Sequence, residues 1–339
     1  MHFDARWARS IPLAPLDTRQ MAPKTFIVGN RRIDRTCVAT MKSPIRHLME
    51  DHVGNSVFNI APERKAESHE SFDNFDLICT NERPWRFCAD PKKREVFVSR
   101  GAVELVWCSS LAHFLFYTRL IQGKKVDRPM EVDPRSDEVV RSSLDLLRWA
   151  IICQLNNDKA DDWPLDMPAP RRNPSDGSEN AANELCLVSC AFMLHHELAH
   201  IRLCHSAGVD SALSLSQEKE ADIAAAEWVL DGLNEDSLIF SKRLLGVTQP
   251  LLLATIMGLY GRSFGGIEHP FSYDRLTSLL NRFLSTRNHP VKWVAFAVLD
   301  LHFENSGRKL QKEKFTDPDE ALETLCDQLA DEVRAAARP

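Results

Sequence analysis

The sequence predicts an α+β protein that is mostly helical, with a small sheet early in the chain. The chain has 339 residues, of which 44% are hydrophobic, so it can bury a sizeable core. Strand-forming residues cluster at Val96, Phe97 and Val98. From about residue 103 onwards, apolar residues recur with helical spacing in one segment after another. These observations place the sheet before the helices.

The N-terminal quarter carries little structural signal. Residues 1–90 show weak periodicity and several prolines, and we expect an accessory region whose fold the sequence does not reveal. Residues 91–310 are expected to form the core, and residues 311–339 to add a C-terminal helix. Within the core, residues 94–101 are predicted to begin with a strand, which Gly101 ends.

Two long helices and a long loop are predicted next. The first helix begins near Val103 and the second covers Ser136–Leu155, with one apolar stripe along it. That stripe consists of Val140, Leu144, Leu147 and Ile151. Residues 156–180 are rich in Pro, Asp and Asn, which is typical of a loop. A loop insertion of this length within a compact domain is usually functional or disordered.

The remaining chain is expected to be helical. One helix is predicted from about Ala181 to His205, and another begins at Ser214, where Gln217 completes a capping-box pattern. Further helices are predicted at about 237–262, 272–286, 291–303 and 318–337. The apolar run 244–261 nearly reaches the length of a membrane span. Gln249 and Pro250 in its middle favour a buried core helix instead, so no membrane span is expected.

Charge and cysteine content restrict the class of protein. The net charge of −6 gives no support for nucleic-acid binding. The N-terminus lacks the apolar core of a signal peptide. The nine cysteines are odd in number and no pair has C-x-x-C spacing, so reduced thiols in a cytoplasmic protein are expected. Cys186 and Cys190 share a helix face, where burial is favoured over a structural zinc site.

The motif H-E-x-x-H occurs in the predicted helix 181–205, as His196, Glu197 and His200. Residues four apart lie on one helix face, roughly 6 Å apart along the axis, so two imidazoles there can bind one Zn²⁺. Glu197 projects about 100° away from His196 and can lie beside the metal, within reach of a bound water. This arrangement suits metal-assisted hydrolysis, in which the carboxylate takes a proton from the water.

A third ligand is expected from the next helix, where the sequence is EKEAD. Glu218 and Asp222 are four residues apart and share a face, whereas Glu220 points away from it. One of the two can bind the metal while the other accepts the free N–H of a ligating histidine. By itself this segment is typical of a solvated acidic face. A turn that folds the two helices antiparallel would bring it to the histidines instead.

A helix without metal is the simplest competing interpretation. In that case the histidines would make ordinary hydrogen bonds within a helical core. The apolar approach LVSCAFML indicates a buried helix, in which neighbouring histidines need a partner. We take His205 as a histidine at the helix end and expect His195 to face away from the metal.

Taken together, these residues resemble the gluzincin metallopeptidases, especially the CAAX prenyl proteases and heat-shock membrane proteases. That group is known for H-E-x-x-H with a further histidine five residues on, then E-x-x-A-D, then His-Pro followed by an arginine. The three motifs occur here in that order, at 196–205, 218–222 and 269–275, and span roughly a quarter of the chain. The metzincin class is excluded, because Leu203 and Ser206 stand where it needs Gly and His.

The resemblance implies a zincin-like core with a small sheet and an active-site helix pair. It implies Zn²⁺ as the cofactor, with His196, His200 and Glu218 as its ligands and Glu197 as the general base. It also implies that Asp222 holds a ligating histidine.

The third motif implies three more residues near the site. Arg275 would lie close to the metal centre, and His269 or Tyr273 would stabilise the oxyanion. Without the resemblance, HPFSYDR would be taken as a helix N-terminus with proline in its first turn.

The activity implied is that of a soluble zinc-dependent endopeptidase acting on a protein or peptide substrate. The membrane members carry several spans, and the expected absence of one here is closer to soluble relatives. Those are the Lit-type phage-exclusion peptidases, whose length fits better, and the H-E-x-x-H proteins that cleave bacterial repressors. The resemblance to the Lit-type peptidases implies a role in phage defence. Residues 94–101 would be the edge strand that holds the substrate backbone.

The alternative is a zinc-bearing regulatory or interaction protein, related to stress or phage defence, with little or no hydrolysis. The loop 156–180 would then be a partner surface. Glu197 argues against this alternative, because a structural zinc site needs no base. Four protein ligands around the metal would favour it.

Overall fold

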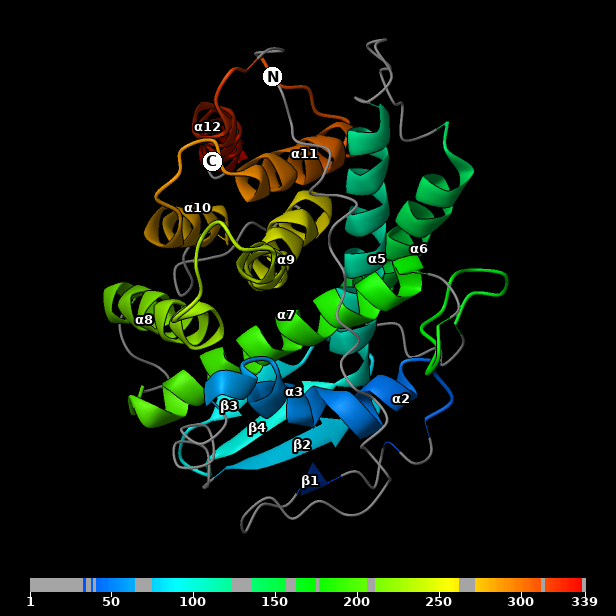
Figure 1. Cartoon of the computed structure of the whole chain (residues 1–339), viewed down its shortest axis with the longest axis vertical. Coiled ribbons are helices and arrows are strands. Elements are labelled where there is room, and N and C mark those ends of the chain that lie inside the picture. The colour runs from blue at the N-terminus through cyan, green and yellow to red at the C-terminus, as the bar shows by residue number, and fades with distance from the viewer. Residues whose placement is uncertain are drawn as a thin grey trace.

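The protein is a small sheet with helices packed above it (Figure 1). It is α+β and mostly helical, as predicted. The structure is a computed structural model. It describes residues 33–34, 38, 41–64, 75–123, 136–156, 163–174, 177–205, 211–261, 272–311 and 315–336.

Among the described residues, the sheet has four strands in the order β1-β2-β4-β3. The strands are β1 (Ile33–Asp34), β2 (Asp76–Thr80), β3 (Phe87–Asp90) and β4 (Glu95–Ser99). β2 runs parallel to β1 and β4, and β3 runs antiparallel to β4. The expectation that residues 94–101 form an edge strand is therefore wrong, because β4 is paired on both sides. The edge strands of the described sheet are β1 and β3.

A tight corner connects the sheet to the first long helix, α5 (Arg100–Gly123). The hydroxyl of Ser99 accepts hydrogen bonds from the backbone N–H groups of Ala102 and Arg86. Only glycine fits at position 101, because a Cβ there would lie 1.6 Å from the carbonyl oxygen of Arg83. The corner therefore fixes the segment before β3 against the start of α5.

Short helical turns lie between β1 and β2 in the chain and below α7 in the view of Figure 1. They are α2 (Arg46–Leu48), the π-helical turn η3 (Met49–Val53), α3 (Gly54–Asn59) and the 3-10 turn η4 (Pro62–Arg64). α3 contacts the long helix α7 (Gly177–Arg202).

Helix α7 is the central element, in contact with β3, β4, α5, α8 and α9 (Figure 1). It begins at Gly177, four residues before the predicted start, and ends at Arg202. Almost all of its side chains between Ala181 and Ile201 are buried. α7 packs closely against α9 (Leu238–Gly261) at Gly246. A Cβ at this position would lie 2.3 Å from Cγ1 of Val188 in α7.

Helix α8 (Ser211–Leu230) begins three residues before Ser214. The prediction that Ser214 caps the helix is therefore wrong: Ser214 lies within it. Helix α9 is the one described helix long and apolar enough to span a membrane, and 72% of its apolar window is buried in the structure. That burial is what a core helix requires.

The remaining helices are α6 (Glu138–Leu155), α10 (Ser272–Phe283), α11 (Pro290–Asn305) and α12 (Pro318–Ala336). Of these, α6, α10 and α11 pack against α5 or α9, and α12 packs against α11 and α10. Of the predicted loop 156–180, residues 177–180 belong to α7, and the described segment 163–174 is held by Trp163. Its ring centroid lies 5.9 Å from that of Trp107 and 5.3 Å from that of Trp149.

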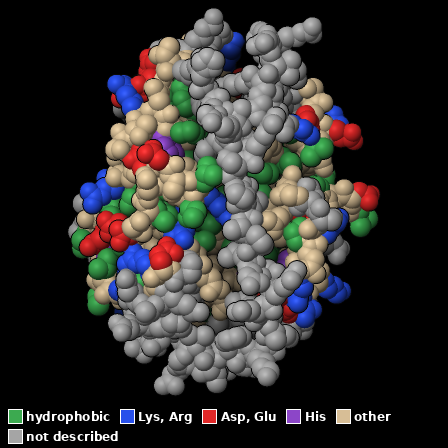
Figure 2. Space-filling model, viewed as in Figure 1, with side chains coloured by type: hydrophobic (Ala, Val, Ile, Leu, Met, Phe, Trp, Pro, Cys, Tyr) green, Lys and Arg blue, Asp and Glu red, His purple; other side chains and the backbone are tan. Residues whose placement is uncertain are grey.

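The eight cysteines among the described residues are free thiols, and Cys186 and Cys190 are buried as predicted. On the described part of the face in Figure 2, basic and acidic side chains are interspersed. Exposed ion pairs such as Arg282 with Glu227 (3.6 Å) contribute little to stability.

Candidate metal and active site

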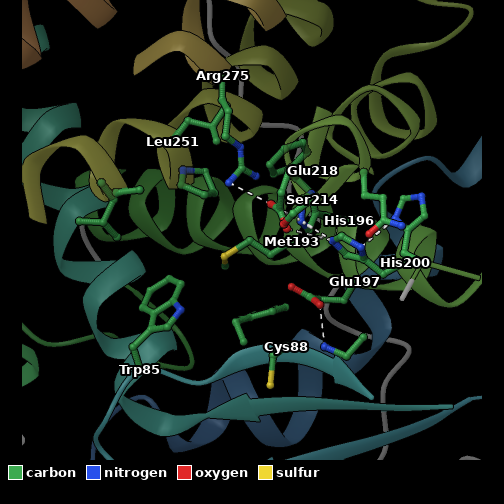
Figure 3. A pocket seen from close by; sticks show the side chains of 18 of the residues that line it. Trp85, Cys88, Met193, His196, Glu197, His200, Ser214, Glu218, Leu251 and Arg275 are labelled. Carbon is green, nitrogen blue, oxygen red and sulfur yellow. Dashed lines mark hydrogen bonds and ion pairs between the residues drawn. The ribbon is translucent and has the colours of Figure 1, made fainter. Parts of the chain in front are cut away.

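Three side chains from two neighbouring helices converge on one point (Figure 3). His196 and His200 come from α7, and Glu218 comes from α8. The two Nε2 atoms lie 3.1 Å apart. Oε2 of Glu218 is 3.5 Å from Nε2 of His196, and Oε1 is 3.5 Å from Nε2 of His200.

The spacing of these donors fits a metal ion. Bonds of about 2.0–2.2 Å in tetrahedral geometry separate neighbouring ligand atoms by roughly 3.3–3.5 Å. The two imidazoles are slightly closer than this, at 3.1 Å, and each lies 3.5 Å from a different oxygen of Glu218, so both carboxylate oxygens are near the point where a metal would lie. Two imidazoles and a carboxylate are also a donor set that zinc accepts. Among the described residues these three alone form such a group, which leaves a fourth position free of described ligands.

The carboxylate of Glu197 lies beside this group, on the side of the edge strand (Figure 3). Its Oε2 accepts a hydrogen bond from the backbone N–H of Ala89 in β3, at 2.6 Å. Burial raises the pKa of Glu197 to about 7, against the lowering effect of His196 and of the bond from Ala89. A carboxyl group with this pKa can both accept and release a proton near neutral pH.

Asp222 lies on the far side of His196, one helical turn beyond Glu218. Its Oδ1 is 2.9 Å from Nδ1 of His196. Arg275 donates to both of its carboxylate oxygens, at 2.6 and 2.7 Å, and Nη1 of Arg275 lies 3.2 Å from Oε2 of Glu218. Asp222 therefore fixes the orientation of one imidazole, and Arg275 in turn fixes Asp222.

The charges at the site favour a cation. Although burial alone would raise it, hydrogen bonds and nearby positive charge lower the pKa of Glu218 to about 2. Burial lowers the pKa of His196, but the carboxylates of Asp222 and Glu218 outweigh it and raise that pKa to about 10. In the protein without metal these acids thus draw a proton onto the imidazole, at the place a metal would occupy.

A second set of contacts lies behind His200, and the sequence did not predict it. Nδ1 of His205 lies 2.8 Å from Nδ1 of His200, and Nε2 of His205 lies 3.3 Å from Oε2 of Glu220. His205 is therefore not merely a histidine at the helix end. Glu220 does point away from the three donor side chains, as predicted, but it contacts His205. The H-x-x-x-x-H spacing of His200 and His205, with an acid on α8, was the available signal.

The site opens into a cleft of about 800 Å³ between β3, α7, α8 and α9. The donor group and Glu197 line one part of the cleft, and Trp85, Met193 and Leu251 line another (Figure 3). Further apolar lining comes from Phe87, Phe192, Pro250, Leu253, Ala254 and Met257. The cleft can therefore hold a chain with apolar side chains next to the polar centre.

The other predicted site residues have different positions. His269 lies outside the described residues. Tyr273, on α10 with Arg275, is buried and is not one of the residues that line the cleft. His195 faces away from the three donor side chains. Its Nε2 is 3.2 Å from the carbonyl oxygen of Val57, and its ring stacks on Trp228.

Comparison with known families places this site in a family context. The model of the Peptidase U49 family matches residues 96–296, more than half of the chain. The chain belongs to the Peptidase U49 family. The matched segment contains α7, α8 and α10, and hence every side chain of the group described above.

A curated relative agrees with this assignment. The chain is 27% identical over 288 residues to the Cell death peptidase of Escherichia coli (strain K12), a match that covers 81% of this chain and 95% of that protein. The predicted resemblance to Lit-type peptidases is thereby confirmed. No solved structure matches the chain.

Proposed function

We propose that this Peptidase U49 member is a zinc-dependent endopeptidase in which Glu197 is the general base. Its peptidase class follows from the family. The observation that carries the proposal is the convergence of His196, His200 and Glu218 at ligand spacing, with a buried carboxylate beside them. A site built only for structure would have no use for that carboxylate.

The chemistry that zinc supplies in such a site is Lewis acidity, which acidifies a water ligand and polarises a peptide carbonyl. Glu197 takes the proton of the attacking water and delivers it to the leaving amine. The hydrogen bond from Ala89 holds its carboxylate at the free edge of β3. Asp222 and Arg275 keep the His196 imidazole in the orientation that presents Nε2.

The substrate is proposed to bind as an extended strand along β3. Alternate residues of a strand direct their backbone groups to the same side. The carbonyl oxygen of Arg86 accepts a hydrogen bond from the N–H of Ser99 in β4. The backbone N–H and C=O groups of the alternate residues Phe87 and Ala89 therefore point to the free edge of β3. That edge faces the cleft, and Phe87 and Ala89 both line it. A peptide paired there with Phe87 and the carbonyl of Ala89 would pass directly by Glu197, which takes the N–H of Ala89.

The test is the variant Glu197→Gln, which keeps the size of the side chain but cannot take a proton. We expect it to bind zinc as the wild type does and to lose at least a hundredfold in kcat on a peptide that the wild type cleaves, selected from a peptide library. Glu227→Gln, an exposed change on α8, is the matched control and should cleave normally. Equal turnover by Glu197→Gln would refute the role of this residue.

A further inference from the structure

We propose that His205 and Glu220 are positioning residues that hold the His200 imidazole in the tautomer that binds metal. The inference rests on the proposed metal centre. It concerns a pair of residues outside the group of three donors. His205 lies beyond the end of α7, yet its side chain is only 7% exposed and contacts His200 directly.

The turn that ends α7 brings His205 to this contact. Cys204 has a φ of 54°, in the left-handed region that side chains other than glycine rarely adopt. The turn brings the N–H of His205 within 3.0 Å of the carbonyl oxygen of His200. The ring of His205 then lies edge-on to that of His200, with 4.9 Å between their centroids. With the N–H of Cys204 lying 3.4 Å from the carbonyl oxygen of Ile201, this turn is the Schellman motif that commonly ends a helix, so the contact between the two rings carries the inference and the turn does not.

The contacts define which atoms carry protons. When Nε2 of His200 is presented to a metal, its Nδ1 carries the proton and is a donor. Nδ1 of His205, 2.8 Å away, must then be unprotonated and accept it. The proton of His205 consequently lies on Nε2, which donates to Oε2 of Glu220 at 3.3 Å. The donors run in one direction, from His200 through His205 to the carboxylate.

The two metal-binding histidines are thus held in different ways. His196 is held by Asp222, which is buried and paired with Arg275. His200 is held by an imidazole, and the acid behind it, Glu220, is 59% exposed. We therefore expect His205 to contribute most of the effect on this side and Glu220 less, because solvent screens an exposed carboxylate.

Three substitutions at two positions test the proposal through zinc affinity. His205→Asn keeps an acceptor atom where Nδ1 stands, whereas His205→Leu has a similar size and no acceptor. We expect His205→Leu to weaken zinc binding about 10- to 100-fold, as removal of such outer partners does, and His205→Asn to stay within about threefold of the wild type. Glu220→Ala should weaken binding about two- to fivefold.

Affinity is measured by competition with a chromophoric zinc chelator, and the visible spectrum of the Co²⁺-loaded protein reports the ligand geometry. Thermal unfolding of the metal-free protein separates metal positioning from folding, since a positioning role predicts equal melting temperatures. Glu227→Ala, also on α8 and 50% exposed, is the matched control for Glu220→Ala.

The outcomes are distinct from those of the proposed function. If the wild type binds zinc and the zinc affinity of His205→Leu is within twofold of the wild-type affinity, this inference is overturned while the proposed metal centre stands. If the wild type binds no zinc, both are overturned. Should His205→Leu fail to fold, Glu220→Ala decides: affinity equal to that of Glu227→Ala would overturn the inference.

Discussion

The guanidinium of Arg275 donates two hydrogen bonds to the carboxylate of Asp222, at 2.6 and 2.7 Å. Both side chains are largely buried, with 16% and 5% exposed. Arg275 comes from α10 and Asp222 from α8, so this pair connects a helix outside the H-E-x-x-H motif to the imidazole of His196. A two-point contact of this kind fixes position as well as charge.

We predict that Arg275→Ala lowers the free energy of unfolding by about 3 kcal/mol, because it leaves the Asp222 carboxylate buried without its cation. Zinc affinity should fall as well, since Asp222 would no longer be held in place. Urea unfolding and zinc competition measure the two effects. Arg282→Ala removes an arginine of the same helix that is 62% exposed, and should cost less than about 0.5 kcal/mol. Equal losses in both variants would contradict the prediction.

Substitutions of Ala89 test the edge strand. Ala89→Pro removes the N–H that donates a hydrogen bond to Glu197, and its ring obstructs the free edge of β3. We expect kcat/KM to fall at least tenfold, which corresponds to about 1.4 kcal/mol in activation free energy. Ala89→Gly keeps the N–H and should stay within about threefold. Steady-state kinetics on one peptide compare the two. If Ala89→Pro cleaves as well as Ala89→Gly, the substrate does not depend on this edge.

The buried pair His113 and His302 should make stability depend on pH. Their Nε2 atoms lie 3.1 Å apart between α5 and α11. Burial lowers the pKa of His113 to about 4, and burial together with His113 lowers that of His302 far below its usual value. Unfolded histidine has a pKa of about 6.5. The pair's contribution is therefore fully present above that pH and is lost as the pH falls toward 4.

The variant His302→Gln should reduce this acid sensitivity. Its amide can accept from His113 and donate to the hydroxyl of Tyr260, which lies 3.3 Å from Nδ1 of His302 in the wild type. Urea unfolding at about pH 7.5 and pH 5 gives the loss of stability for each protein. An identical loss in both would show that the pair does not titrate in this way.

Asp300 has the opposite pH dependence. Burial and the neighbouring charge of Glu304 raise the pKa of Asp300 to about 6. Ionisation above that pH therefore destabilises the fold. We predict that Asp300→Asn raises the free energy of unfolding at neutral pH by about 1 kcal/mol, after allowance for solvent screening, with little effect at pH 4. A variant no more stable than wild type at neutral pH would count against this account.

The sequence was most informative where helical periodicity decides geometry. The spacing of His196 and His200 fixes them on one face, and Glu218 and Asp222 likewise share a face of the next helix. Spacing within one helix does not give the register between two helices, so the residue pattern alone does not decide which acid would bind a metal. In the structure, Glu218 faces both Nε2 atoms and Asp222 faces Nδ1 of His196.

Two parts of the site could not be predicted from local pattern. β3 has the sequence FCAD, which shows no run of β-branched residues, and its strand conformation depends on pairing with β4. The contact of His205 depends on the positive φ of Cys204, which periodicity does not reveal. Ser214 and Gln217 matched a capping pattern, but α8 already begins at Ser211 and both residues line the cleft.

X-ray absorption at the zinc edge, combined with elemental analysis of the purified protein, tests the metal centre most directly. We predict one zinc per chain, with nitrogen and oxygen neighbours at about 2.0–2.2 Å and an imidazole signature from two histidines. Glu218→Ala should lose one oxygen neighbour and most of the affinity. Less than about a tenth of a zinc per chain, or sulfur neighbours near about 2.3 Å, would contradict the proposed site.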